Sequence, residues 1–350
     1  MAARRHDAGR SANHRRNRPS ASRYVPLAAL IIAVAALALS SLSLYISLGP
    51  RAAATGTTAT NAIANTVTFG HTLAGINQQL NASALAVING APDSYFETAG
   101  LMYLNGSINN TVLTNFAGVN SLIVNGRPSV VYLGSITCIF CGENRWAMAL
   151  ALGRFGSFSR LFQGYSSFGD YDVPTLYWHA ADYTHRDSLS VSSNAILTGS
   201  YYSSSYINFF PIEGQGNLTG GFFIQSLPII GAEINNTGNS TYIGVFRYIL
   251  SLQGSNSTLF RGTPYTIWGN RLFAGADAVD FGNSTPASSS LPLTYMTHAQ
   301  VLSQLASPAD QFAWTEYAAA DVYIASVCTS INNTAQICSL SAIQKIEALK

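Results

Sequence analysis

The residues with the clearest chemical potential are Cys138 and Cys141, in the stretch "VVYLGSITCIFCGENRW". Two thiols at this spacing could form a redox pair, half of a metal site or a structural disulfide. The apolar residues before Cys138 predict a buried strand at about 129–134, and those after Cys141 predict a helix that ends near Gly153 or Gly156. A strand would therefore deliver Cys138 to the first turn of a helix.

The predicted place of Cys138 favours redox chemistry. Backbone N–H groups and the helix dipole at a helix N-terminus stabilise a thiolate, which is the form of cysteine that attacks a disulfide. Cys141 would lie one turn later and resolve the mixed disulfide. A structural disulfide is the alternative, but closing so small a loop restricts the unfolded chain little.

The other two cysteines, Cys328 and Cys338, predict a structural disulfide between the end of one helix and the start of the next. A zinc site would need both cysteine pairs, or one pair with histidines, around one ion. The second pair lacks the usual spacing and the histidines are scattered, so we expect no metal. No glycine pattern of a nucleotide-binding loop and no hydrolase motif is present, and the proposed chemistry needs no cofactor.

The predicted elements alternate as in an α/β sandwich. Ser307 and Pro308 would begin a C-terminal helix, as N-cap and first helical residue. The turn residues Gly269 and Asn270 predict a hairpin. The expected order is a strand at 129–134, the helix after Cys138, a strand at 173–183, an insertion at about 185–240, a helix at 240–254, two strands within 263–276, and C-terminal helices.

This order resembles the thioredoxin superfamily, in particular the Dsb-type disulfide oxidoreductases and isomerases. The resemblance rests on the strand, the CxxC pair at a helix start, and a distant "Gly262-Thr263-Pro264" before an apolar strand. It implies a thioredoxin-like three-layer sandwich with a long insertion and C-terminal helices. It also implies that Pro264 is a cis-proline facing the cysteines and that Thr263 offers its backbone to a bound peptide. Val173-Pro174 is the rival for this role.

More narrowly, residues from about 115 to 340 resemble an archaeal family, domain of unknown function 929. That family shows a Gly-Lys-Pro, strand, CPxC, Ala-Glu-Arg-Trp and Arg-Phe-Gly-x-Phe run, a later "GTPY" and a final cysteine pair. Ile139 replaces the family's usual proline, and neither residue between the cysteines is histidine, so the clearest sign of a strong oxidant is missing. The matching residues near the cysteines are Arg127, Pro128, Cys138, Cys141, Glu143, Arg145, Trp146, Arg154, Phe155, Gly156 and Phe158.

Glu143 and Arg145 follow the cysteines within the predicted helix. They could move a proton or tune the reactivity of Cys138. Equally, Glu143 suits a helix N-terminus and Arg145 could pair with a local carboxylate. Both interpretations remain open from the sequence.

The N-terminus predicts a membrane anchor. Residues 1–23 form a basic arm with seven arginines and one acidic residue, Asp7, and residues 24–50 carry no charge. An apolar stretch of this length can span a bilayer, and the arginines place the arm in the cytoplasm and the remainder outside. Such an arm contacts anionic lipid rather than nucleic acid. Residues 51–70 predict a stalk, and residues 71–350 the extracytoplasmic domain.

The exported part has few charges and many hydroxyl and amide side chains. Because such a surface stays hydrated when carboxylates are protonated, we expect an acidic exterior, as around an acidophile. Nine Asn-x-Ser/Thr sequons favour a surface glycoprotein. They begin at Asn81, Asn105, Asn109, Asn217, Asn235, Asn239, Asn256, Asn283 and Asn332.

These observations predict a membrane-anchored, extracytoplasmic thiol–disulfide oxidoreductase or isomerase. Cys138 would attack, Cys141 would resolve, and Thr263-Pro264 would present the substrate backbone. Its partners would be protein thiols or disulfides and a redox partner in the membrane. The alternative is a non-catalytic surface glycoprotein that uses a thioredoxin-like domain to bind a partner.

Overall fold

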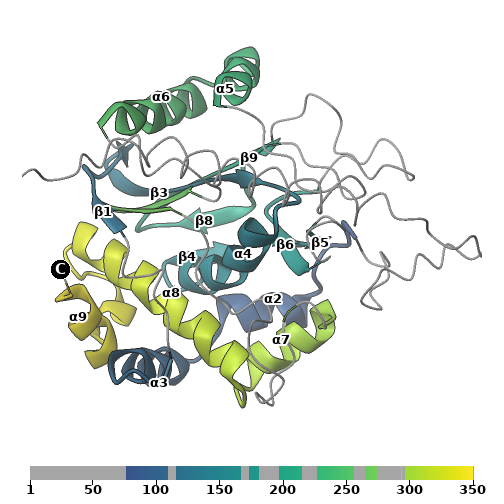
Figure 1. Cartoon of the computed structure of the whole chain (residues 1–350), viewed down its shortest axis with the longest axis vertical. Coiled ribbons are helices and arrows are strands. Elements are labelled where there is room, and N and C mark those ends of the chain that lie inside the picture. The colour runs from purple at the N-terminus through teal and green to yellow at the C-terminus, as the bar shows by residue number, and fades with distance from the viewer. Residues whose placement is uncertain are drawn as a thin grey trace, which may run out of the picture. The chain divides into compact units, whose positions relative to one another are not determined.

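The computed structural model shows a mixed α/β protein (Figure 1). The basic arm, the predicted anchor at 24–50 and the predicted stalk lie outside the described residues. Within the described part of the chain, no helix combines the length and apolar character needed to cross a membrane. The structure describes residues 76–108, 116–166, 173–180, 197–214, 227–255, 265–274, 293 and 296–349.

A seven-stranded sheet lies at the centre of the described residues. Its strands, in spatial order, are β1 (Phe116–Gly118), β11 (Arg271–Ala274), β10 (Tyr265–Trp268), β3 (Arg127–Ser135), β9 (Asn208–Gly214) and β7 (Leu197–Thr198), with β2 (Ile123–Val124) also against β3. β3 and β9 run parallel, with Ser135 opposite Gly214. β10 is antiparallel to β3 and to β11. The predicted strand at 129–134 and the hairpin at Gly269-Asn270 are confirmed.

Helices pack on both faces of this sheet (Figure 1). They are α4 (Ile139–Leu152) and α8 (Gln311–Ser330) on one face, and α5 (Leu227–Asn236) and α6 (Ser240–Ser255) on the other. The side chains of β3 alternate between the two: Val130 and Tyr132 pack with α4 and α8, whereas Val131 and Leu133 pack with α5 and α6. A strand buried on both faces needs a continuous apolar run, which the sequence of β3 supplies.

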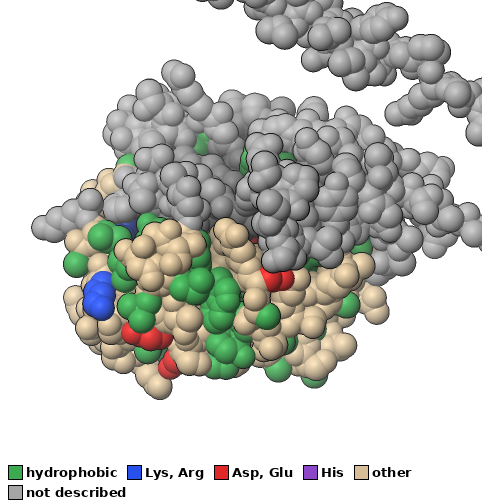
Figure 2. Space-filling view, turned by 60° about the horizontal axis from the view of Figure 1, so that its bottom comes forward, with side chains coloured by type: hydrophobic (Ala, Val, Ile, Leu, Met, Phe, Trp, Pro, Cys, Tyr) green, Lys and Arg blue, Asp and Glu red, His purple; other side chains and the backbone are tan. Residues whose placement is uncertain are grey.

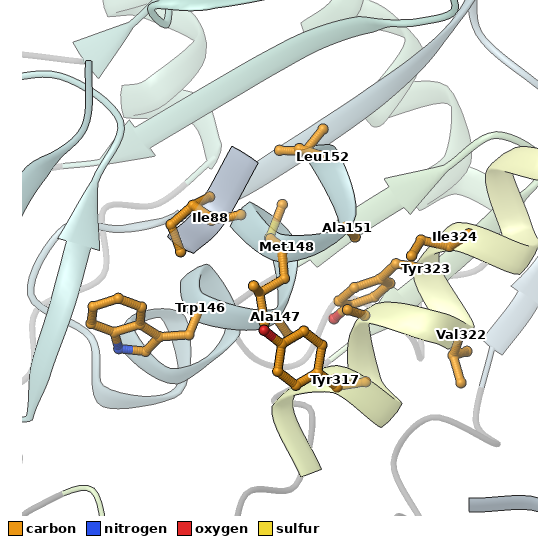
Figure 3. Close-up of a cluster of buried hydrophobic side chains, with 14 of the residues drawn as sticks. Ile88, Trp146, Ala147, Met148, Ala151, Leu152, Tyr317, Val322, Tyr323 and Ile324 are labelled. Carbon is orange, nitrogen blue, oxygen red and sulfur yellow. The ribbon is translucent and has the colours of Figure 1, made fainter. Parts of the chain in front are cut away.

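The contact between α4 and α8 fixes the helix that follows the cysteines. Figure 3 shows Trp146 and Met148 of α4 in one cluster with Tyr317 and Tyr323 of α8. All four side chains are fully buried, and the ring of Tyr323 stacks on Trp268 of β10 at 4.4 Å. Helix α4 is therefore held between the sheet and α8.

Four short strands follow α4 and form two small sheets. β4 (Gly156–Phe158) pairs with β8 (Tyr202–Ser204), and β5 (Phe162–Tyr165) pairs with β6 (Pro174–Tyr177). The strand expected at 173–183 is thus shorter and lies outside the main sheet. β9 falls within the range 185–240 where we expected an insertion, yet it is the parallel neighbour of β3. The strand signal of β9 is weak because Pro211 lies in its middle.

The remaining helices contribute side chains to the same hydrophobic core as α4 and α8. They are α2 (Ala82–Asn89), α3 (Asp93–Leu104), α7 (His298–Ala306), α9 (Ser341–Glu347) and the 3-10 helix η5 (Gln336–Ser339). The prediction that Ser307 caps α8 is wrong: Asp310 is the N-cap and accepts from Ala313 N, while Ser307 ends α7. A carboxylate so placed also complements the helix dipole. The disulfide between Cys328 and Cys338 is confirmed, and it joins α8 to η5.

The described surface agrees with the low charge content. Figure 2 shows one face on which charged side chains are few among those described. The sequon asparagines within the described residues are all exposed; these are Asn81, Asn105, Asn235, Asn239 and Asn332.

Candidate functional site: the two cysteines and the buried ion pair

The turn between β3 and α4 delivers Cys138 to the start of the helix. β3 ends at Ser135, and α4 begins at Ile139 with Cys138 as its N-cap. The backbone N–H of Cys141 donates to Cys138 Sγ at 3.4 Å. A sulfur at this position receives a helix N–H and lies at the positive end of the helix dipole, and both stabilise a thiolate.

Cys141 lies in a different environment one turn later. Its Sγ accepts from Ser135 N at 3.4 Å. Burial raises the pKa of the Cys141 thiol well above its ordinary value, and its contact with Cys138 adds to the rise; Arg145 and the Ser135 N–H oppose it. Cys138 and Cys141 are not joined by a disulfide. The pair is therefore asymmetric, with one sulfur at a helix N-terminus and one that holds its proton.

Arg145 lies one turn beyond Cys141 and is completely buried. Its guanidinium donates to Glu213 Oε1 at 2.8 Å, with a shortest ion-pair distance of 2.6 Å. It also donates to the carbonyls of Ser135 at 2.9 Å and Ile136 at 3.3 Å. Burial acts to lower the pKa of Arg145, but Glu213, Tyr132, Cys141 and Tyr177 together outweigh it and raise that pKa. Arg145 thus stays charged and holds the turn that carries Cys138.

The Ser135 peptide connects these groups. Its N–H donates to Cys141 Sγ and its C=O accepts from Arg145. Removing the charge of Arg145 would therefore disturb both the electrostatics and the position of the Cys141 thiol.

β6 packs closely on the first turn of α4, where Gly142 leaves room for Thr175. The Thr175 hydroxyl donates to the Gly142 carbonyl at 2.5 Å, and a Cβ on Gly142 would lie 3.3 Å from Thr175 Cβ. Trp146 Nε1 donates to the Pro174 carbonyl at 3.0 Å. The strand with the rival proline is thereby fixed to the helix that carries the cysteines.

The exposure of the CIFC residues is uneven. Cys138 and Cys141 are 0% exposed, whereas Phe140 between them is 43% exposed. Glu143 of α4, for which the sequence left a tuning role and a local structural role open, is fully buried. The exposed side chain of this stretch is thus apolar, and both sulfur atoms lie below the surface.

Thr263 and Pro264 lie outside the described residues. Tyr265, the next residue, begins β10 opposite Leu133. Because β10 is antiparallel to β3, its N-terminal end lies at the same edge of the sheet as the C-terminal end of β3, which leads to Cys138. The C-terminal end of β9 reaches this edge too, since Gly214 pairs with Ser135.

The sequence did not indicate Glu213, Tyr132 or Thr175 as members of this site. Glu213 lies in a strand that we did not expect, and Tyr132 and Thr175 looked like ordinary strand residues. Glu213, an acidic residue in an otherwise apolar stretch, was the one available signal, because buried carboxylates are normally paired.

Comparison with known families finds a match over part of the chain. Residues 116–224 match the family model described as Domain of unknown function (DUF929). This DUF929 region begins at β1 and extends past β9, so it includes both cysteines, Arg145 and Glu213. It ends before β10. No curated protein and no solved structure matches the chain.

Metal binding at the cysteines finds no support in the geometry. Cys328 and Cys338 are bonded to each other, which removes both sulfurs from a four-cysteine set. Over the described ranges, no group of three or more His, Cys, Asp or Glu residues is arranged to hold a metal ion.

Proposed function

We propose that this protein is a membrane-anchored, extracytoplasmic thiol–disulfide oxidoreductase or isomerase. The observation that carries the proposal is the asymmetry of the cysteine pair at the β3–α4 junction. The Cys138 thiolate would attack a substrate disulfide and form a mixed disulfide as one substrate thiol leaves. Cys141 would then attack Cys138 Sγ, so that the second substrate thiol leaves and a Cys138–Cys141 disulfide remains. The reverse sequence oxidises a dithiol substrate.

The strand order supports a thioredoxin-like fold for this chemistry. A parallel β3–α4–β9 unit is followed by α5 and α6, the antiparallel β10–β11 hairpin and the C-terminal helix α8. This arrangement agrees with the fold that the sequence resembles, with the cysteines at the start of the first helix. We propose that Pro264, just before β10, faces them and that Thr263 presents the substrate backbone.

The membrane location rests on the sequence. The apolar segment 24–50 would lie in the bilayer, and the arginines before it would keep residues 1–23 in the cytoplasm. The exposed sequon asparagines are compatible with an external, glycosylated domain. A redox partner in the membrane would exchange electrons with the pair.

A second candidate function is partner binding without catalysis. The full burial of both sulfurs favours it, because a disulfide or thiol of another protein must reach Cys138. In that case the pair would have a structural role and Phe140 would contribute only to a binding surface.

A trapping experiment distinguishes the two functions. We expect Cys141→Ser to accumulate a mixed disulfide with a peptide substrate that contains a disulfide. The matched Cys138→Ser variant should not. We also expect a Cys138–Cys141 reduction potential above about −300 mV, since structural disulfides lie below it. If Cys138 stays unreactive towards thiol reagents in the reduced full-length protein, the binding function replaces the catalytic one.

A further inference from the structure

Because Gly134 has no side chain, the Tyr132 hydroxyl and the Cys141 sulfur can both lie close to its backbone. Gly134 lies in β3 two residues after Tyr132, so both positions face α4. A Cβ on Gly134 would lie 2.4 Å from the Tyr132 hydroxyl oxygen and 3.0 Å from Cys141 Sγ. A side chain at position 134 would therefore contact both the phenol oxygen and the thiol sulfur.

The Tyr132 hydroxyl lacks a hydrogen-bond partner among the described residues, although its side chain is 0% exposed. The rings of Tyr132 and Trp178 make an edge-to-face contact, with 5.9 Å between ring centroids. This contact does not involve a hydrogen bond of the Tyr132 hydroxyl. A buried hydroxyl left without a partner costs stability. The buried Tyr132 hydroxyl beside Cys141 therefore does not contribute to stability through a hydrogen bond among the described residues.

Burial around this space favours the neutral forms of both the phenol and the thiol. The Arg145 guanidinium carbon lies 5.6 Å from the centre of the Tyr132 ring. Burial raises the pKa of Tyr132 well above its ordinary value, which outweighs the opposing effect of Arg145, so the hydroxyl keeps its proton and remains a donor. Burial also raises the pKa of Cys141. A Cys141 thiolate thus needs local stabilisation.

We propose that the Tyr132 hydroxyl donates a hydrogen bond to Cys141 Sγ as it becomes a thiolate in the resolving step. This inference rests on the proposed function. In that step the Cys141 S–H bond breaks, a Cys141–Cys138 S–S bond forms, and the S–S bond between Cys138 and the substrate breaks. The leaving substrate sulfur takes up one proton, so protons and electrons balance. Tyr132 keeps its own proton throughout.

Tyr177 provides a matched control. It is equally buried, and the Arg145 guanidinium carbon lies 5.7 Å from its ring centre. Its hydroxyl, however, donates to the Tyr165 carbonyl at 2.8 Å and accepts from Tyr165 N at 3.1 Å. Tyr132→Phe and Tyr177→Phe therefore remove the same atom beside the same charge. The first removes an orphan hydroxyl, and the second removes two hydrogen bonds of the fold.

The kinetic test uses dithionitrobenzoate with the reduced full-length protein in detergent. Attack by Cys138 releases one thionitrobenzoate, and resolution by Cys141 releases a second. We expect Tyr132→Phe to keep the first rate and to slow the second about tenfold, the effect of losing one hydrogen bond to a charged group. We expect Tyr177→Phe to lower thermal stability and leave both rates unchanged. An unchanged second rate in Tyr132→Phe overturns the inference.

A second measurement does not depend on access to the sulfurs. In a Cys138→Ser background with carbon-13-labelled cysteine, the Cβ shift of Cys141 reports its ionisation. We expect the midpoint to move to higher pH in Tyr132→Phe and to stay in place in Tyr177→Phe. If the reagent never reacts with Cys138, the proposed function fails, and this titration still decides the role of Tyr132. Coincident titration curves for the two phenylalanine variants would refute that role.

Discussion

The Arg145 guanidinium and the Glu213 carboxylate form an ion pair at 2.6 Å in which both side chains are 0% exposed. The partners are 68 residues apart in sequence and join α4 to β9 at the edge of the sheet where the cysteines lie. A pair buried this deeply leaves an uncompensated charge when one member is removed.

Removing one member of this pair should lower the free energy of unfolding more than removing both members. We expect Glu213→Leu to lower the free energy of unfolding by about 3–5 kcal/mol, because it leaves Arg145 charged and buried. The double variant Arg145→Met/Glu213→Leu should recover part of that loss. Urea unfolding of the three proteins gives the comparison. Equal losses in the single and double variants would show that packing, and not charge, dominates.

The disulfide between Cys328 and Cys338 should contribute to stability. We expect Cys328→Ser/Cys338→Ser to lose about 2–4 kcal/mol, since the crosslink restricts the unfolded chain. The control Cys138→Ala/Cys141→Ala removes two thiols and no crosslink that the structure contains. Treating wild type with a reductant before urea unfolding should reproduce the loss. An unchanged midpoint after reduction contradicts this prediction.

Asp321 of α8 should make the fold more stable in acid. It is fully buried, and a Cβ on Gly100 of α3 would lie 2.9 Å from its Oδ2. Burial raises the pKa of Asp321 well above its ordinary value and Glu97 adds to the rise, whereas the Gly100 backbone opposes it. Because the folded-state pKa exceeds the unfolded one, the stabilisation is complete below about pH 3.9 and is lost as the pH rises through the folded-state pKa.

Asp321→Asn tests this sign. Relative to wild type, its free energy of unfolding should rise between pH 3 and pH 7, because the amide has no proton to lose as the pH increases. Urea unfolding at both pH values gives the difference, and Glu97→Gln serves as the neighbouring control. The prediction is wrong if Asp321→Asn and wild type keep the same difference at both pH values.

His179, unlike Asp321, should make the fold less stable in acid. Burial lowers the pKa of His179 to about 4, and Arg145 adds to the effect. In the unfolded chain His179 binds a proton below about pH 6.5, whereas in the folded protein it stays neutral down to about pH 4. The free energy of unfolding therefore falls as the pH decreases from about 6.5 to about 4. We expect His179→Gln to lose less stability over this interval, by about 2–3 kcal/mol. Parallel stability curves for variant and wild type would exclude this role.

The sequence predicted those parts of the structure whose signal is local. Consecutive apolar residues predicted β3, the Gly269-Asn270 turn predicted the β10–β11 hairpin, and the position of Cys138 between a strand and a helix followed from both. The N-cap of α8 was misplaced because Ser307 and Asp310 are both good cap residues, and Ser307 already ends α7.

What the sequence missed depends on contacts between distant segments. β9 contains Pro211, which argues against a central strand, and only its pairing with β3 overrides that signal. The partner of Arg145 could not be chosen without knowing that β9 lies beside β3. The shared space at Gly134 likewise depends on where α4 places Cys141.

The parallel pairing of β3 with β9 has a consequence for biogenesis. The ribosome completes Cys138 and Cys141 well before it reaches Asn208, so both thiols exist while half of the sheet that buries them is missing. During that interval each thiol can exchange with a disulfide of another molecule and form a mixed disulfide. Cys328 and Cys338 emerge last and close together, which favours their mutual bond. A nascent chain halted before β9 should therefore form mixed disulfides faster than the finished protein, in which both sulfurs are 0% exposed.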